Sequence, residues 1–451
     1  MPRLFGTFGV RGVANVDLTP ELAFELGISL ATYLGNAGKV AVGYDNRTSS
    51  EMLENACISG LLSGGCDVLR LGMVPTPVLS FGVTHFDCSA GVIITASHNP
   101  PQWNGIKFWK EDGGSFPRAE ELEIEKIIEQ KSWKMAEWQR VGKTRTADAI
   151  QPYLEALLEK VPPLSRELKV VVDCANATGS LVTPILLRRL GCKVVSLNCQ
   201  IDGTFPGRMP EPTSENLQGL SSAVRSFGAD VGLAQDGDAD RAVVVNERGE
   251  VMVGDRTFAL VAQHYLRGKK APKIVTTVAT SAVVDEVAKR LGGTVVRTRV
   301  GEPEIVAEIR ARGGDLGGEE NGGTIFPGWS LARDGIMTIA QFVSALAESG
   351  LKVTELDATL PKFYQLKKRV ECPNELKQSV LEKLKEEFSG YRLNTTDGLR
   401  IDFADGWLLL RPSGTEPVFR CFSEATTEQR AQELAEMGFS KVKEVLKRVG
   451  A

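Results

Sequence analysis

The stretch Gly91-Val92-Ile93-Ile94-Thr95-Ala96-Ser97-His98-Asn99-Pro100 runs from apolar residues straight into a short polar loop. The apolar half predicts a buried strand, and the turn-forming Asn99-Pro100-Pro101 predicts where that strand stops. Ser97 therefore follows a strand end, where we expect its hydroxyl to face a cleft. The glycine spacing of a hydrolase nucleophile elbow is absent around it. Lys107, a few residues later, supplies a cation, and a hydroxyl near a lysine suits phosphate better than an acyl group. Taken alone, the same segment also fits an ordinary polar turn.

A second segment, Asp236-Gly237-Asp238-Ala239-Asp240-Arg241, carries a carboxylate at every second position. In an extended segment these side chains point to one side. Grouped oxygen ligands suit Mg²⁺ or Ca²⁺, and Mg²⁺ commonly keeps positions open for phosphate oxygens. An EF-hand calcium loop is excluded because Arg241 stands where that loop needs glycine, and residues 242–245 are strand-like. A solvated Asp-rich turn is the other alternative, but buried acids between apolar runs need a compensating cation.

Two further loops carry groups that bind sugar phosphates. Arg411-Pro412-Ser413-Gly414-Thr415-Glu416-Pro417 follows an apolar run, and its side chains and backbone N–H groups suit a phosphate. Arg420 would add a second cation. Gly317-Gly318-Glu319-Glu320-Asn321-Gly322-Gly323 is glycine-rich but acidic, so it suits sugar hydroxyls rather than phosphate. Separately, the first loop also fits an ordinary turn and the second a flexible surface loop.

Taken in their order along the chain, the four segments resemble those of the α-D-phosphohexomutase superfamily. This superfamily includes phosphoglucomutase, phosphomannomutase and phosphoglucosamine mutase. Phe5-Gly6-Thr7-Phe8-Gly9-Val10-Arg11-Gly12 resembles the amino-terminal active-site segment of that family, so the resemblance covers nearly the whole chain. The opening segment and the glycine-rich loop are most similar to the archaeal branch usually named phosphoglucosamine mutase. One departure is Gly323, where many relatives carry a histidine proposed as a general base. The resemblance therefore leaves the base unassigned.

The resemblance implies four functional loops: a serine loop (residues 95–100), a metal loop (236–241), a sugar loop (317–323) and a phosphate loop (411–417). It implies a phosphate on Ser97, Mg²⁺ held by that phosphate and the three aspartates, and a hexose 1,6-bisphosphate as intermediate and activator. The expected metal ligands are Ser97, Asp236, Asp238 and Asp240. The expected catalytic residues are Ser97, Lys107, Arg11 and His98, with Lys107 ranked first for proton transfer and His98 also suited to orienting Ser97. The expected substrate-binding residues are Glu319, Asn321, Arg411, Ser413, Gly414, Thr415 and Arg420.

The choice of hexose depends on a single acidic pair. Glu319 and Glu320, with Glu302 in a nearby loop, favour a protonated amino group, so glucosamine phosphate is the first expectation. A mutase of broad specificity for mannose and glucose phosphates is the alternative. A phosphatase would use the same serine and metal, but it has no need of a separate phosphate loop. A non-catalytic sugar-phosphate sensor would keep the binding loops without needing Ser97, Lys107 and the aspartates.

The composition fits a multidomain enzyme of an α/β class. The chain has 451 residues, which should form several domains, and its net charge of −4 does not favour nucleic acid or acidic membranes as partners. Eight cysteines without metal-binding spacing indicate buried thiols in a reducing compartment. With no leader or apolar span apparent, we expect a cytoplasmic protein that binds a small-molecule sugar phosphate and leaves room for a homo-oligomer.

The alternation of strands and helices predicts mixed α/β layers. The resemblance adds three related mixed α/β domains and a smaller α+β carboxy-terminal domain around a central active-site cleft. We expect the domains to span residues 1–148, 149–250, 251–364 and 365–451, carrying the serine, metal, sugar and phosphate loops in turn.

Overall fold

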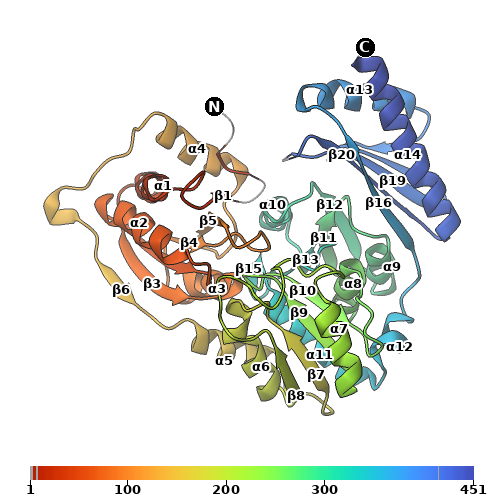
Figure 1. The fold of residues 1–451 in the computed structure, drawn as a ribbon, viewed down its shortest axis with the longest axis horizontal. Helices are drawn as coiled ribbons and strands as arrows, with labels where there is room; N and C mark the ends of the chain where they lie inside the picture. The colour runs from red at the N-terminus through yellow and green to blue at the C-terminus, as the bar shows by residue number, and fades with distance from the viewer. Residues whose placement is uncertain (1–3, 7–8, 415, 451) are drawn as a thin grey trace.

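The computed structural model describes residues 4–6, 9–414 and 416–450. Four sheets, each with its own helices, follow one another along the chain. Figure 1 shows the amino-terminal unit on the left and the carboxy-terminal unit at the upper right, with the second and third units between and below them. This four-domain α/β architecture confirms the predicted fold class, whereas the expected domain boundaries stay a prediction.

The first unit is built on a six-stranded sheet with the order β1-β5-β4-β2-β3-β6. Its central strands β2, β3 and β4 are parallel, and β5 runs antiparallel to both β4 and β1. The strands are β1 Val10–Val13, β2 Lys39–Tyr44, β3 Asp67–Met73, β4 Ala90–Ile94, β5 Trp103–Lys110 and β6 Thr144–Thr146. The helices are α1 Pro20–Tyr33, α2 Ser50–Ser63, α3 Thr76–His85 and α4 Arg118–Glu129, followed by the 3-10 turn η1 Trp138–Arg140.

Local sequence explains where these elements begin and end. Thr19 caps α1 by accepting a hydrogen bond from the N–H of Leu22 at 3.3 Å, and Pro20 occupies the first turn, where its missing N–H costs nothing. Every residue of β4 is buried, as the apolar run at residues 91–94 predicts for a strand covered on both faces. The serine loop therefore follows a strand whose two faces are both packed against other residues.

The second and third units are also α/β units, built on sheets with fewer strands than the first. The second sheet has the order β10-β9-β7-β8 and the third β12-β11-β13-β14-β15, each with a parallel centre and antiparallel pairing at one end. The second unit contains α5 Ile150–Lys160, β7 Lys169–Asp173, η2 Thr178–Leu181, α6 Thr183–Arg189, β8 Lys193–Leu197, α7 Gln218–Phe227, β9 Val231–Gln235 and β10 Ala242–Val245. The third contains α8 Gly254–Tyr265, β11 Lys273–Thr277, α9 Val283–Arg290, β12 Thr294–Thr298, α10 Glu302–Arg312, β13 Leu316–Gly318, β14 Thr324–Phe326, β15 Ser330–Arg333, α11 Gly335–Ser349 and α12 Val353–Asp357.

The fourth unit differs because its five-stranded sheet is entirely antiparallel. The sheet order is β16-β20-β19-β18-β17. Its elements are β16 Tyr364–Glu371, η3 Asn374–Leu376, α13 Lys377–Glu387, β17 Arg392–Asn394, β18 Leu399–Phe403, β19 Gly406–Pro412, β20 Val418–Ala425 and α14 Glu428–Val449. The phosphate loop lies at the connection between β19 and β20, which pair as an antiparallel hairpin.

The apolar cores show how firmly the units are joined. One large cluster of buried side chains runs through the first three units, from residues of β2 and α3 to residues of α11. The fourth unit has its own core. It meets the third unit through a small cluster that includes Val278, Ala279, Trp407 and Leu409. The first three units therefore form one packed body, and the fourth is attached to it through a smaller apolar contact.

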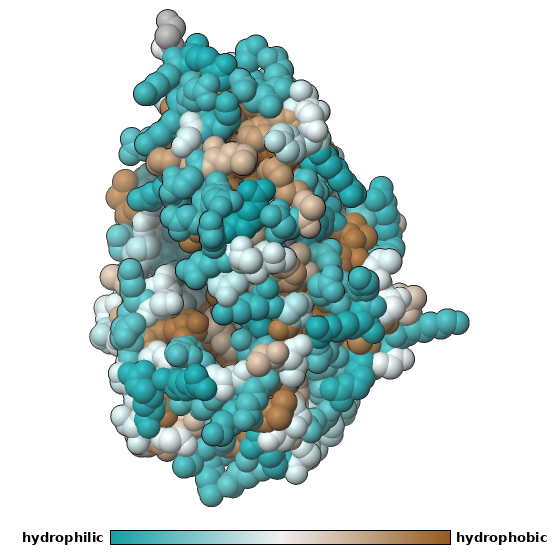
Figure 2. Space-filling view, turned by 90° about the vertical axis from the view of Figure 1, so that its right-hand side faces the viewer, coloured by the Kyte–Doolittle hydropathy of each residue, from teal (hydrophilic) through white to brown (hydrophobic). Residues whose placement is uncertain are grey.

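The face of the molecule drawn in Figure 2 is largely hydrophilic, and apolar residues form scattered areas on it. Among the described helices, none combines the length and apolar character that crossing a bilayer requires.

Seven of the eight cysteines are buried and Cys199 is half-buried, in keeping with their expected role as small apolar side chains.

Helices α1 and α2 approach each other through glycines, which gives a stability test. A Cβ on Gly60 would lie 2.2 Å from the carbonyl oxygen of Phe24. Alanine in a helix is normally about 1 kcal/mol more favourable than glycine. Here we expect Gly60→Ala to destabilise the protein by about 1–3 kcal/mol, because backbone has to move. The matched control is Gly219→Ala in α7, where a Cβ meets no described atom within 4 Å. Calorimetric melting should show a lower Tm for Gly60→Ala only; equal or higher Tm values for both variants would contradict the prediction.

Candidate active site

Ser97 is held in a fixed, unusual backbone conformation at the end of β4. Its φ of 53° lies in the left-handed region, which a residue other than glycine seldom adopts. The Ser97 N–H donates to Thr95 Oγ1 at 2.9 Å. The buried guanidinium of Arg47 donates to the carbonyl oxygens of Ser97 at 2.9 Å, Asn99 at 2.7 Å and Pro100 at 2.6 Å. Several hydrogen bonds from the Arg47 side chain therefore fix the backbone of the serine loop.

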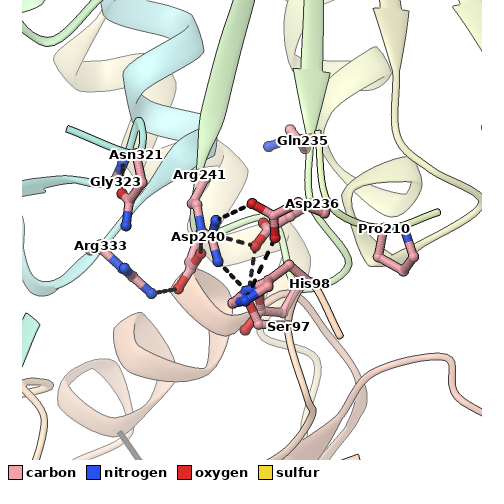
Figure 3. Close-up of polar contacts among 12 residues, drawn as sticks. Ser97, His98, Pro210, Gln235, Asp236, Asp240, Arg241, Asn321, Gly323 and Arg333 are labelled. Carbon is pink, nitrogen blue, oxygen red and sulfur yellow. Dashed lines mark hydrogen bonds and ion pairs between the residues drawn. The ribbon is translucent and has the colours of Figure 1, made fainter. Parts of the chain in front are cut away.

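The metal loop connects β9 to β10 and brings its carboxylates to the same place. It does so as a turn, with Ala239 at a φ of 58°, and not as the extended segment that the sequence predicts. Asp236, Asp238 and Asp240 are all fully buried, and one oxygen of each lies within 4.8 Å of the others. Ser97 Oγ donates to Asp236 Oδ2 at 2.8 Å, so the serine loop and the metal loop meet directly (Figure 3). Burial, reinforced by the neighbouring Asp240 and Asp238, raises the pKa of Asp236 well above its ordinary value.

These carboxylates have the chemistry of a divalent-cation site. The Oδ1 atoms of Asp236, Asp238 and Asp240 are buried and accept no hydrogen bond from the described residues. Buried anionic oxygens without partners are costly, and hard oxygen donors of this kind are the preferred ligands of Mg²⁺. The donor atoms of the three aspartates therefore fit a bound divalent cation.

Lys107 and Arg241 supply part of the positive charge around the loop. Lys107 Nζ donates to Asp238 Oδ2 at 2.9 Å, and Thr76 Oγ1 donates to the same oxygen at 2.7 Å. Burial acts against the charged form of Asp238, but Lys107, Thr76 and Arg333 together outweigh it and hold the pKa of Asp238 below its ordinary value. Arg241 Nε lies 3.4 Å from Asp236 Oδ2. Lys107 from β5 and Thr76 from α3 thus reach the acids, while Arg241 belongs to the metal loop itself.

The other two expected catalytic residues lie beside Ser97. Arg11 on β1 is half-buried and donates to Asn99 Oδ1 at 2.9 Å, which places it against the serine loop. His98 Nδ1 lies 3.3 Å from Ser97 Oγ and is also in contact with Arg241. Burial first, and then Arg241 and Arg11, lower the pKa of His98 far below its ordinary value. An imidazole that resists protonation is better suited to orienting Ser97 than to exchanging protons.

The sugar loop lies next to the metal loop. The Gly322 carbonyl accepts a hydrogen bond from the Ala242 N–H at 3.2 Å, which ties the loop to the first residue of β10. Asn321 Oδ1 accepts from the Gly323 N–H at 3.0 Å and so closes the turn. Glu319 is buried and accepts from Arg333 Nη1 at 2.7 Å. The structure thus brings both expected sugar-binding residues into the neighbourhood of the aspartates.

The phosphate loop contributes to a cavity of about 410 Å³ between the first, third and fourth units. Arg411 and Gly414 line this cavity, and Arg411 Nε donates to Asp397 Oδ2 at 2.6 Å. Arg118 and Arg299 line it as well, so arginines from three units converge there. The Ser413 hydroxyl accepts from the Glu416 N–H at 3.2 Å.

Of the expected phosphate-binding residues that the structure describes, Arg411 and Gly414 line the cavity, whereas Ser413 and Arg420 do not. Arg420 on β20 forms an ion pair with Glu416 at 2.7 Å and is absent from the cavity lining among the described residues. Thr415 lies outside the described residues. Arg118 and Arg299 are not signalled by any motif, and they take part only because α4 and the end of β12 border the same cavity.

Comparisons with known proteins give one consistent family. Four family profiles match in order: "Phosphoglucomutase/phosphomannomutase, alpha/beta/alpha" domain I at residues 2–135, domain II at 151–249, domain III at 253–364, and the "C-terminal domain" at 368–440. A "Phosphoglucomutase/phosphomannomutase" of Thermococcus kodakarensis is 47% identical over 99% of this chain and 100% of its own. A "Probable phosphoglucosamine mutase" of Pyrococcus abyssi is 42% identical over the full length of both chains. A crystal structure of a phosphoglucomutase/phosphomannomutase family protein from Burkholderia thailandensis superimposes with a TM-score of 0.89 at 29% identity, covering 98% of this chain and 97% of the other.

The buried aspartates predict that a divalent cation stabilises the fold. An ion at about 100 times its dissociation constant would contribute about 2.7 kcal/mol, so Mg²⁺ should raise the Tm by several degrees. We expect Asp236→Asn to lose most of this response, because one of the anionic ligands is gone. Asp202→Asn is the control, since Asp202 in the same unit is only half-buried and accepts from Thr204. Thermal melting with EDTA or Mg²⁺ measures the effect; an equal response in Asp236→Asn and wild type would show that the ion binds elsewhere.

Proposed function

Because the chain belongs to the phosphoglucomutase/phosphomannomutase family, we propose that it interconverts hexose 6-phosphates and hexose 1-phosphates through a phosphate carried on Ser97. One observation carries the proposal. The Ser97 hydroxyl lies 2.8 Å from Asp236, inside a group of buried carboxylates whose free oxygens fit a divalent cation. A phosphate on this serine would be repelled by the aspartates unless such a cation were bound.

The first half of the reaction transfers the phosphoryl group to the sugar. The O1 hydroxyl of a hexose 6-phosphate attacks the phosphorus on Ser97; the new O–P bond forms, the bond to Ser97 Oγ breaks, the hydroxyl proton passes to a base, and Ser97 Oγ takes up a proton as it leaves. The product is a hexose 1,6-bisphosphate. After the bisphosphate turns around, Ser97 Oγ gives up its proton and attacks the phosphorus of the 6-phosphate, the bond to the sugar O6 breaks, O6 is protonated, and the hexose 1-phosphate is released. A hexose 1,6-bisphosphate would also serve as activator by phosphorylating Ser97.

The residues of the site supply positioning and charge, which account for most catalysis of phosphoryl transfer. Asp236, Asp238, Asp240 and the phosphate on Ser97 would hold Mg²⁺, which when bound neutralises the charge of the transferring group. Lys107 and Arg11 add fixed positive charge on the side of the first unit. Losing one such group typically costs about 3 kcal/mol of barrier, or about a hundredfold in rate. Lys107 remains the first choice for proton transfer, and the low pKa of His98 supports its role in orienting Ser97.

The cavity beside the phosphate loop supports a mutase over a phosphatase. Arg411 from the fourth unit, with Arg299 and Arg118, would bind the phosphate at the far end of the sugar. Hydrolysis has no need to hold a second phosphate, whereas a bisphosphate that rebinds in reverse does. A sugar-phosphate sensor would keep this cavity without requiring Ser97 beside the aspartates. Glu319 and Asn321 would bond the sugar hydroxyls between the two phosphate sites.

Glucosamine phosphate is the substrate that we propose first. Relatives along nearly the whole chain carry the name "Probable phosphoglucosamine mutase" at 42–45% identity. Glu320 in the sugar loop and Glu302 at the start of α10 supply acids, although Glu319 and Glu302 already pair with Arg333. The second candidate is a mutase of broad specificity, favoured by the relative at 47% identity whose name includes both glucose and mannose enzymes.

Ser97→Ala should reduce mutase turnover by at least about a thousandfold, because the group that carries the phosphate is lost. Intact-mass analysis of wild type should also show one phosphate, mapped by peptide analysis to Ser97. The matched control is Ser80→Ala, a buried serine of the same unit that bonds the Gly113 carbonyl and Ser330. Near-normal turnover by Ser97→Ala, or wild-type protein that is never phosphorylated there after treatment with a hexose 1,6-bisphosphate, would rule out the mechanism.

The substrate is decided by measuring kcat/KM for the 6-phosphates of glucosamine, mannose and glucose in parallel, with Mg²⁺ and a hexose 1,6-bisphosphate present. We expect glucosamine 6-phosphate to be preferred by about tenfold or more, the effect of roughly one charge-assisted hydrogen bond. Comparable or higher values for mannose and glucose phosphates would instead establish the broad mutase. EDTA should abolish turnover with every substrate, whereas a sensor would have no turnover to lose.

A further inference from the structure

Arg333, the last residue of β15, joins the sugar loop to the metal loop. Its side chain is almost completely buried. The guanidinium donates to Glu319 Oε2 at 2.7 Å and forms an ion pair with Asp240 of the metal loop. Its Nε lies 3.1 Å from Glu302 Oε2, at the start of α10. Figure 3 shows Arg333 reaching Asp240 with Asn321 and Gly323 beside it. One cation thus contacts carboxylates from three separate segments.

Gly323 provides the space that this arrangement needs. A Cβ built on Gly323 would lie 2.3 Å from Arg333 Cδ and 3.2 Å from its Nε. The backbone of Gly323 does not have a positive φ, so it is space and not conformation that excludes a larger residue there. Arg333 could move away from an added methyl group only by giving up its contacts with the carboxylates. Gly323 and Arg333 therefore depend on each other.

The charges explain why the arginine matters. Asp240, Glu319 and Glu302 are all buried, and without a cation between them they would repel one another. A guanidinium has a planar fork of donors that can serve several carboxylates at once, whereas a lysine offers a single point charge. It also stays protonated and so cannot accept a proton from the sugar. Arg333 is therefore suited to fixing distances between loops and unsuited to acting as the missing base.

We propose that Arg333 is a positioning residue for the mutase reaction, one that holds the Glu319 carboxylate of the sugar loop at a fixed place relative to Asp240 of the metal loop. This inference rests on the function proposed above. It gives a physical reason for glycine at position 323, because the guanidinium passes where a side chain would lie. Loss of Arg333 releases Glu319 and leaves Asp240 with one cation fewer, so both sugar binding and phosphoryl transfer suffer.

The test is a double-mutant cycle of Gly323→Ala, Arg333→Ala and the two combined, read as kcat and KM for a hexose 1-phosphate with Mg²⁺ and a hexose 1,6-bisphosphate. We expect each single variant to lose about thirtyfold or more in kcat/KM, through both a higher KM and a lower kcat. The combined variant should be within about threefold of Arg333→Ala, because both changes remove the same contact. Independent effects would instead multiply.

Guanidinium ion separates a lost charge from a lost fold. Millimolar guanidinium should restore kcat/KM of Arg333→Ala by about fivefold or more, because the ion fits the space left by the side chain, and it should not rescue the combined variant, in which the new methyl group intrudes. Should Arg333→Ala fail to fold, Arg333→Lys serves in its place: we expect it to fold, with a kcat/KM reduced by at least about tenfold, because a single ammonium cannot bridge the carboxylates.

The matched control is Arg310→Ala. Arg310 on α10 donates to Asp112 at 2.7 Å and 2.6 Å and to the Ser115 carbonyl at 2.7 Å, so it too is an arginine that joins two units. We expect it to lower Tm but to leave kcat/KM within about threefold of wild type and unresponsive to guanidinium. Full kcat/KM in folded Arg333→Ala or Arg333→Lys, or effects that multiply in the combined variant, would overturn the proposal. A wild-type protein with no mutase turnover would overturn the proposed function, and the role of Arg333 with it.

Discussion

Three carboxylates share one buried site, and much of the structure around them offsets the free-energy cost of burying their charges. Asp236, Asp238 and Asp240 are fully buried on a six-residue loop. Isolated charges in such surroundings would be far too costly to keep, so partners of opposite charge have to be supplied from elsewhere. Lys107 comes from the first unit and Arg333 from the third. The need to neutralise the metal loop is thus also what brings separate units of the chain into contact at this point.

The serine loop beside these carboxylates is held in place by separate contacts of its own. Ser97 adopts a left-handed backbone, and Gly237 allows a close approach, since a Cβ there would lie 2.4 Å from the Ser97 carbonyl oxygen. Strain of this kind persists only where the surroundings hold it in place, and Arg47 does so by binding the loop's carbonyl groups. A nucleophile or phosphate carrier that is already in position loses little freedom in the transition state.

The parts that the sequence predicted are those encoded by neighbouring residues. The apolar run at residues 91–94 is the buried strand β4, and Asp236, Asp238 and Asp240 bring their carboxylates together within one short loop, although as a turn and not as an extended segment. Arg333 and Arg47 escaped prediction for the opposite reason. Arg333 meets partners at positions 240, 302 and 319, and Arg47 meets a loop that is about fifty residues away in sequence. A single arginine after a strand has no local pattern that identifies such partners, because only the packing of the units creates them.

The distribution of packing matches what a two-sided reaction requires. The metal and serine loops are held among three units that share one apolar core, so the geometry of phosphoryl transfer is set by dense packing. The phosphate loop belongs to the unit with a separate core and a small apolar contact, which includes Trp407 against Val278. A bisphosphate must be gripped firmly where its phosphate reacts and must turn around between the two steps. The densely packed first three units suit the firm binding of the reacting phosphate. The smaller apolar contact of the fourth unit suits the release and rebinding of the other phosphate.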